Sequence, residues 1–389
     1  MIVTRPLRDA AEHVLRAWNR YEIERGAHPV IDYDCSPVTS DVPAVDNRLE
    51  ALQRLSELHA EAAAAGDTAL ATRIDADIAY CAALLGEHDS LDRYVRRTQG
   101  CAPKGWSDEY LQQHLERAQH CLAALGIDWG PKTLTDLMEA EGPLDASVSA
   151  DAIREAAADL EPSVRAATGA TADYDLTIES VDIDAYWSYW LDGAGQKPRL
   201  RINLRNARFT QVVARQFALH EILGHALQFA SIAARCAEED VPWIRLCSVH
   251  SPNQVLFEGL AQAMPLFVTP DDENLTARVR LDHYHQLVRG QLHLALAAGH
   301  PILDLAEHAR RSVPYWTDSQ IADLLTDRGA NTLLRSYMWA YSAGIDWFVR
   351  LADTPDAPTD HVLRAVYQAP HTPGDLMAYW PSGPDIGAE

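Results

Sequence analysis

QVVARQFALHEILGHALQFASIAA, residues 211–234, is apolar almost all the way round a helix. A helix of that kind is buried inside a protein. His220, Glu221 and His225 are set into this apolar segment, and buried ionisable groups are costly unless something satisfies them. A divalent cation is the simplest common partner for all three. The segment therefore predicts a metal-binding helix at the centre of a mainly helical fold.

The spacing of the two histidines predicts a distortion of this helix. They are separated by one residue more than in the familiar HExxH motif. An ideal α-helix turns about 100° per residue, so positions i and i+5 lie about 140° apart and do not share a face. One π-type turn of roughly 4.4 residues brings them to about 50°. We expect such a turn between His220 and His225, where Gly224 lowers its steric cost.

The third metal ligand is expected from a second apolar helix. The run LFEGLAQAMPLF, residues 256–267, carries a single carboxylate, Glu258. Two histidines and one glutamate leave the fourth tetrahedral position of a catalytic zinc open for water. The metal lowers the pKa of that water and polarises a carbonyl. Glu221, next to a ligand, is the expected base that takes and returns the proton. We predict one Zn2+ per chain, held by His220, His225 and Glu258.

Other interpretations of the ionisable residues stay open. The two motif histidines could be core side chains bonded to backbone carbonyls, with Glu221 in a buried ion pair with Arg215. His250, in the loop before the second metal helix, is an alternative candidate for the site. His283 and His285 are two residues apart on an expected helix and do not share a face. Solvated or structural roles are expected for both.

A late helical segment, residues 331–352, contains two tyrosines on one face. Tyr337 and Tyr341 are four residues apart, and the segment is otherwise rich in Met, Trp, Ala and Gly. Aromatic packing is one interpretation. The other is a phenol that donates a hydrogen bond to the oxyanion of a tetrahedral intermediate. The small residues 342–344 would leave room for a substrate beside the ring of Tyr341, which favours that tyrosine.

Outward from these motifs, helices dominate both halves of the chain. Apolar residues recur at helical spacing in segments 1–26, 45–65, 69–85, 107–125, 151–168, 210–237, 254–266, 274–298, 331–352 and 359–367. Pro265 is expected to end or bend its helix. We predict a helical N-terminal lobe over residues 1–170 and a metal-binding catalytic lobe over residues 171–389. One continuous domain is the alternative.

One region in the middle of the chain has the pattern of β-strands. Residues 173–191 and 197–206 alternate polar and apolar side chains, and DGAGQ, residues 192–196, indicates the turn between them. The expected fold is therefore mainly α and two-lobed, with one small β-hairpin or sheet beside the metal helix. An edge strand at residues 200–204 would offer its backbone to an extended peptide by β-augmentation.

Composition limits the partners and the compartment. The formal net charge of the 389 residues is -23, which repels nucleic acid and anionic membranes when no basic patch offsets it. The six cysteines form no CxxC pair, which argues against a disulfide scaffold. No stretch approaches the ~20 apolar residues that span a bilayer, and the N-terminus lacks the apolar run of a secretory signal. We expect a cytoplasmic protein whose partner is a peptide or small-molecule substrate, not nucleic acid or membrane.

These motifs resemble those of gluzincin-type zinc metallopeptidases. HEILGH, residues 220–225, is similar to the HExxGH motif of the dipeptidyl peptidase III family, whose helix also has the extra residue. FEGLAQ at 257–262 and YMWAYSAG at 337–344 resemble helical bacterial peptidases of the carboxypeptidase Taq kind. The resemblance covers about residues 200–345. It implies that a tyrosine on a late helix, Tyr337 or Tyr341, assists the metal.

The resemblance also assigns the zinc ligands to His220, His225 and Glu258 and the role of base to Glu221. The expected function is a zinc-dependent hydrolase, a metallopeptidase that cleaves short peptides. The alternative keeps the metal but acts on an amide or another small metabolite, because fold does not fix function. A non-catalytic protein with a structural metal is a third interpretation. The presence of Glu221 counts against it, because a structural site needs no base and normally closes all four positions.

Overall fold

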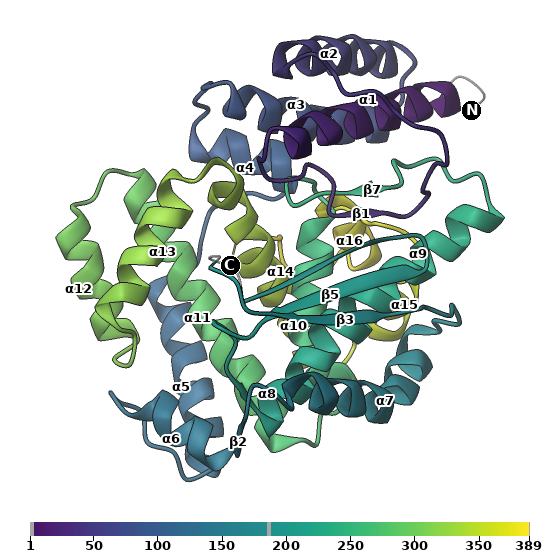
Figure 1. The fold of residues 1–389 in the computed structure, drawn as a ribbon. Coiled ribbons are helices and arrows are strands. Elements are labelled where there is room, and N and C mark those ends of the chain that lie inside the picture. Colours follow the sequence, from purple (N-terminus) through teal and green to yellow (C-terminus); the bar gives the residue numbers. More distant parts are fainter. Residues whose placement is uncertain (1–3, 185–187, 389) are drawn as a thin grey trace.

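The buried segment 211–234 forms a continuous helix whose middle part is a π-helix. Its parts are α8 Gln211–Phe217, the π-helix η1 Ala218–Ala226 and α9 Leu227–Glu238. The computed structural model describes residues 4–184 and 188–388, and helices dominate them (Figure 1). The mainly helical fold is therefore confirmed, and so is the wide turn between His220 and His225.

Most of the expected helices form close to their predicted bounds. The helices before the sheet are α1 Thr4–Glu24, α2 Arg48–Ala64, α3 Thr68–Leu84, α4 Leu91–Gln99, α5 Asp108–Ala124, α6 Thr133–Ala140 and α7 Ser149–Thr168. Those after α9 are α10 Gln254–Val268, α11 Glu273–Ala297, α12 Ile302–Ser312, α13 Asp318–Ala330, α14 Thr332–Asp353, α15 Thr359–Val366 and α16 Pro373–Tyr379. Periodicity did not predict α4, α6, α12, α13 and α16. Residues 1–3 of the first expected helix lie outside the described residues.

The expected end of a helix at Pro265 is wrong. The helix α10 continues through this proline to Val268, and Thr269 N–H donates to the carbonyl of Pro265. Only the last turn follows the proline, so one missing N–H donor at this point does not stop the helix.

The small sheet combines the predicted hairpin with strands from distant parts of the chain. Its order is β3-β5-β4-β1-β7. The strands are β1 Tyr33–Asp34, β3 Thr177–Val181, β4 Tyr189–Ala194, β5 Lys197–Asn203 and β7 Leu246–Cys247. Strands β4 and β5 form the hairpin, but residues 192–194 belong to β4 rather than to the expected turn. Residues 185–187 of the expected first strand lie outside the described residues.

The pairing of β5 overturns one expectation. This strand is paired in parallel with β3 on one side and antiparallel with β4 on the other. Residues 200–203, the part of the expected edge that lies in β5, therefore do not form an edge strand, because β5 has a partner strand on each side. A second sheet joins β2 Pro143–Leu144 to β6 Phe209–Thr210, immediately before the metal helix.

Two hydrophobic cores underlie this arrangement. Helices α1–α3 lie together at one end of the molecule, with β1 and β7 beneath them (Figure 1). They form a small core around Trp18, Leu55 and Ile74. The helices α5 and α7 contribute to the larger core together with η1, α10, α11 and α14. The division into lobes at residue 170 stays a prediction. In the described chain, no helix is both long and apolar enough to span a membrane.

The helices that carry the predicted site approach one another at glycines. A Cβ added to Gly259 of α10 would lie 2.4 Å from the carbonyl carbon of Gly344 of α14, so the two backbones touch there. A Cβ added to Gly224 of η1 would lie 2.9 Å from Cβ of Ala261 of α10. The same added Cβ would lie 2.8 Å from the carbonyl oxygen of Leu219 inside η1, so Gly224 both relieves the wide turn, as expected, and lets α10 come close. These contacts fix the spacing of the three helices.

Replacing Gly344 by alanine should destabilise the fold, because the added methyl group would lie 2.4 Å from the carbonyl oxygen of Val255. Overpacking of this kind costs about 1–3 kcal/mol or more. The free energy of unfolding, measured by chemical denaturation, should fall by about that amount. Gly130→Ala is the matched control, since nothing lies within 4 Å of its added Cβ. Its effect should stay within about 0.5 kcal/mol, and equal effects of the two variants would contradict the close contact.

Candidate metal centre

The structure brings the three predicted metal ligands together. Nε2 of His220 lies 3.2 Å from Nε2 of His225. Oε2 of Glu258 lies 3.3 Å from Nε2 of His220 and 3.7 Å from Nε2 of His225. The histidines come from η1 and the glutamate from α10, as the sequence predicts. The two imidazole rings are nearly perpendicular, at 89°, and point their Nε2 atoms at the same region.

These distances suit a tetrahedral ion. Zinc lies about 2.0–2.2 Å from nitrogen and oxygen ligands, so tetrahedral ligand atoms are about 3.3–3.5 Å apart. The observed separations of 3.2, 3.3 and 3.7 Å scatter around that spacing. The donor set therefore fits zinc without rearrangement of the helices.

Hydrogen bonding within the described chain leaves this cluster incomplete. Oε2 of Glu258 and Nδ1 of His225 are buried, and neither has a hydrogen-bond partner among the described residues. The side chain of Glu258 is only 6% exposed, and a buried carboxylate without compensation is costly. The two histidines lower the pKa of Glu258 despite an opposing effect of burial. Oε2 is the oxygen that faces both imidazoles, where a cation would satisfy it.

Glu221 lies next to the ligands but outside the ligand triangle. Its Oε1 atom is 3.7 Å from Nε2 of His220. Burial raises the pKa of Glu221 to about 7, with His220 opposing the shift and the charge of Glu258 adding to it. The alternative ion pair with Arg215 is wrong, because Arg215 pairs with Asp159 at 2.9 Å and faces Asp272 at 3.9 Å.

The two tyrosines of α14 have different places in the site. Tyr337 donates a hydrogen bond to Oε1 of Glu258, and Tyr341 donates one to the hydroxyl of Tyr337 at 3.2 Å. Burial, the charge of Glu258 and the neighbouring Tyr341 raise the pKa of Tyr337 well above its usual value, so its phenol stays protonated. Tyr337 thus orients a ligand, while Tyr341 reaches the cavity described below.

The start of the metal helix is fixed by a buried polar network. Thr210 accepts a hydrogen bond from the N–H of Val213 and donates one to Glu141 at 2.7 Å. Glu141 also binds Arg278 of α11 through both oxygens. Further along, the hydroxyl of Tyr367 donates to the carbonyl of Leu223 inside the π-helix. The start of α8 and the interior of η1 are therefore both held against neighbouring parts of the chain.

The centre opens into a cavity of about 600 Å³, which is within the usual range for small-molecule sites. His220, Glu221 and Tyr341 line it. Its other polar walls are formed by residues that the sequence did not single out: Asn206, Arg208, Gln216, Asp282, Gln286 and Arg289. Three of these, at positions 282, 286 and 289, lie one helical turn apart on α11. That spacing predicts that the three side chains share one face of α11. It does not predict that this face borders the candidate metal centre.

The room expected beside Tyr341 does not come from residues 342–344. Ser342 is buried and donates to the carbonyl of Gln286 at 2.9 Å, and Ala343 is buried in the larger core. Gly344 packs against α10. Small residues here serve helix packing, and Tyr341 lines the cavity together with Met338 and Arg289.

The other histidines do not join this centre. His250 is fully buried and lies 2.9 Å from Asp77, so its expected reach to the site is wrong. His283 lies 2.9 Å from Asp346, and His285 contacts the hydroxyl of Tyr315 at 2.6 Å. The solvated alternative is wrong for His283, which is buried, and the structural role of both stays a prediction, because His283 also lies in a second group of possible ligands with His114 and Asp346.

Comparisons with known proteins bear on the fold alone. No protein-family model and no curated protein matches the chain. A crystal structure described as "the putative lipoprotein from Colwellia psychrerythraea" is similar, with a TM-score of 0.53 and 14% sequence identity. The match covers 86% of this chain and 63% of that one, so this chain spans less than two thirds of its neighbour. The gluzincin resemblance gains no support from these comparisons and stays a prediction.

Proposed function

We propose that this chain is a zinc-dependent hydrolase that cleaves short peptides. The observation that carries the proposal is the convergence of His220, His225 and Glu258 on one point, with His220 also lining a cavity. A fourth group, Glu221, lies beside the ligands and also lines the cavity. This combination favours a catalytic over a structural metal, because a structural site closes all four positions and needs no base.

The chain's own groups divide the chemical work as follows. A bound zinc ion would polarise the substrate carbonyl and lower the pKa of a water molecule. Glu221 lines the cavity, so its carboxylate would accept a proton from a water held there and return it to the leaving group. Tyr341 lines the same cavity, and its hydroxyl would donate to an oxyanion by turning its one proton away from Tyr337. Tyr337 keeps Glu258 in one orientation and is a positioning residue.

The strand β4 supports a peptide as the substrate. Among the described strands, residues 189–191 pair only with β5, because β1 joins β4 at Gly193 and Ala194. Ser188 and Tyr189 line the metal cavity. The open backbone edge beside the site is therefore the first half of β4 rather than residues 200–204, and an extended peptide can add to it. A small amide metabolite is the alternative substrate, and the turnover of a di- and tripeptide library separates the two.

The cytoplasmic location stays a prediction.

The purified protein should contain about one zinc ion per chain, measured by elemental analysis after dialysis. His220→Ala and Glu258→Ala should each lose it, because two remaining ligands hold zinc poorly. His88→Ala is the control, since this histidine is exposed and remote from the cluster. Full zinc content in both ligand variants would refute the assignment.

Glu221→Gln should keep its zinc and lose at least about 10²-fold in kcat, the usual contribution of a general base. The amide preserves size and hydrogen bonding but cannot accept the proton. Glu238→Gln, at the exposed end of the same continuous helix, should leave both quantities unchanged. A Glu221→Gln enzyme with a near-normal rate would place the base elsewhere.

The two tyrosines should separate in their effects. Tyr337→Phe removes the donor to Glu258 and should weaken zinc binding about 10–100-fold, as loss of a group that orients a ligand commonly does. Tyr341→Phe should lower kcat at least about tenfold, roughly 1.4 kcal/mol, with zinc affinity and Tm unchanged. Zinc titration, kinetics and thermal unfolding of both variants test this split. Loss of stability in Tyr341→Phe without a selective loss of kcat would make it a packing residue.

A further inference from the structure

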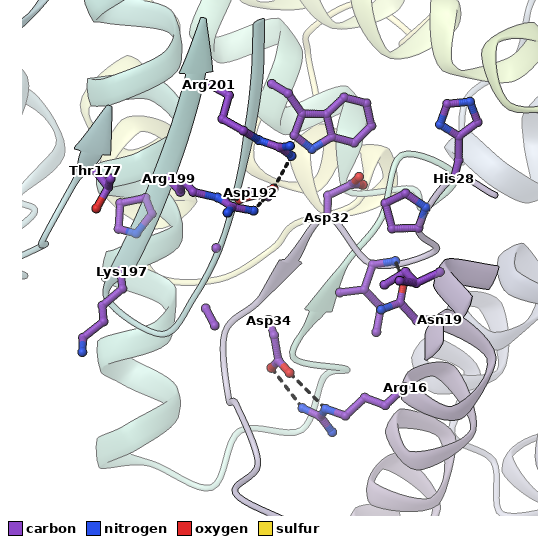
Figure 2. A pocket seen from close by; sticks show the side chains of 17 residues that line it. Arg16, Asn19, His28, Asp32, Asp34, Thr177, Asp192, Lys197, Arg199 and Arg201 are labelled. Carbon is purple, nitrogen blue, oxygen red and sulfur yellow. Dashed lines mark hydrogen bonds and ion pairs between the residues drawn. The ribbon is translucent and has the colours of Figure 1, made fainter. Parts of the chain in front are cut away.

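A second cavity, of about 810 Å³, lies between the N-terminal helical layer and the sheet. Figure 2 shows its two walls. Helix α1 and the segment 28–34 form one wall, and strands β4 and β5 form the other. Clefts between separately packed units are common places for small-molecule sites. No metal ligand of the centre described above lines this cavity.

Strand β5 places a row of cations on one face of the sheet. Lys197, Arg199 and Arg201 alternate with the buried residues Pro198, Leu200 and Ile202. Because successive side chains of a strand point to opposite faces, the three cations share the face that borders the cavity. All three line it. Lys197 is exposed, and in the described part of the chain no carboxylate lies within ion-pair distance of it.

The two arginines of this row are held in place in advance. Asp192 of β4 accepts hydrogen bonds from Arg199 at 2.8 and 2.9 Å and from Arg201 at 2.7 Å (Figure 2). The two guanidinium groups carry two positive charges and the carboxylate of Asp192 carries one negative charge, so the group of three keeps a net positive charge. Because Asp192 orders both side chains, a ligand would not bear the full entropic cost of immobilising them.

The rest of the cavity is close to electrical balance. Arg16 is neutralised by Asp34, with both contacts at 3.0 Å (Figure 2). Asp32 has a buried oxygen, Oδ2, with no hydrogen-bond partner among the described residues. Burial raises the pKa of Asp32 to about 7, against the hydrogen bond from the Val249 backbone and with help from the charges of Asp192 and Glu258. Asp32 is therefore easily protonated and able to donate a hydrogen bond.

The lining thus contains four cationic side chains, Arg16, Lys197, Arg199 and Arg201, against three carboxylates, Asp32, Asp34 and Asp192. This local excess of positive charge lies in a chain whose formal net charge is -23. Composition alone predicts no such patch, because a net charge averages over the whole surface. Trp190 lies directly opposite Arg201 in the β4–β5 register and adds a flat aromatic surface to the same wall.

We propose that this cavity binds a small organic anion, a carboxylate or phosphate monoester attached to a flat apolar body. The anionic group lies against Arg199 and Lys197, and the flat body packs on Trp190. A cationic ligand is disfavoured, because Asp34 and Asp192 are already occupied by arginines and burial favours the neutral, protonated form of Asp32. This proposal is independent of the hydrolase function.

The test uses four probes at one ionic strength in titration calorimetry: benzoate, phenyl phosphate, benzamidine and inorganic phosphate. Benzoate and benzamidine have the same shape and opposite charge, so they test whether the cavity prefers an anion or a cation. We expect benzoate or phenyl phosphate to bind, and the tighter of the two identifies the anionic group. Benzamidine should not bind, and inorganic phosphate should bind more weakly because it cannot use Trp190.

Two variants locate the binding. The double variant Lys197→Gln with Arg199→Gln should weaken the better anion at least about tenfold, since it removes charge-assisted hydrogen bonds. Arg205→Gln is the matched control, because Arg205 follows β5, pairs with Asp182 and lies outside the cavity. His220→Ala should keep full affinity, which separates this site from the metal centre. Binding of benzamidine but not of anions, equal affinity in the double variant, or no binding of any probe would overturn the proposal.

Discussion

At Gly259 and Gly344 the backbones of α10 and α14 touch, and the contact of Tyr337 with Glu258 in the candidate metal centre depends on this approach. A side chain at either position would overlap the backbone of the other helix. Gly224 allows a similar approach between η1 and α10. Ligand atoms must converge to within a few tenths of an ångström to share one ion. Side chains pack helices about 8–10 Å apart, and glycine contacts are the means by which these three helices come closer.

The same contacts explain why the tyrosines belong to the site. Glu258 precedes Gly259 on α10, and Tyr337 lies two helical turns before Gly344 on α14. Once the two glycines are in contact, the phenol of Tyr337 meets the carboxylate of Glu258 without further adjustment. Tyr341 then follows one turn later, at the cavity. The chain Tyr341–Tyr337–Glu258 is a consequence of where the helices cross.

Local patterns in the sequence predict most of the helices and the three candidate metal ligands. The features that they do not predict depend on contacts between residues far apart in the sequence. Three local features predicted the π-turn and the cluster of His220, His225 and Glu258. They are the apolar surface of the helix over residues 211–234, the i, i+5 spacing of its histidines and the lone carboxylate in residues 256–267. Strands β1 and β7 are two residues long and pair across more than 200 residues of sequence, so no local alternation marks them. The same limit applies to β5, whose second neighbour β3 has no sequence signal of pairing. The face of α11 that borders the cavity is likewise set by tertiary packing.

A second buried cluster shows why residue type alone does not define a metal centre. His114, His283 and Asp346 also lie close enough together to share an ion. There, however, the carboxylate of Asp346 accepts hydrogen bonds from Trp106 at 3.0 Å, from Tyr110 at 2.7 Å and from His283 at 2.9 Å. These donors lower the pKa of Asp346 against the opposing effect of burial. Burial also lowers the pKa of His114 to about 3, which keeps its imidazole neutral.

The contrast lies in the unsatisfied oxygen. Both oxygens of Asp346 are satisfied by protein donors, so a cation would have to displace hydrogen bonds that already compensate the buried charge. Oε2 of Glu258 has no such donor among the described residues, and it faces two imidazole nitrogens across a gap of ionic size. A cation bound there would replace no existing hydrogen bond to that oxygen and would satisfy three groups at once. Electrostatic compensation therefore favours His220, His225 and Glu258 as the metal centre and a structural role for the cluster around Asp346.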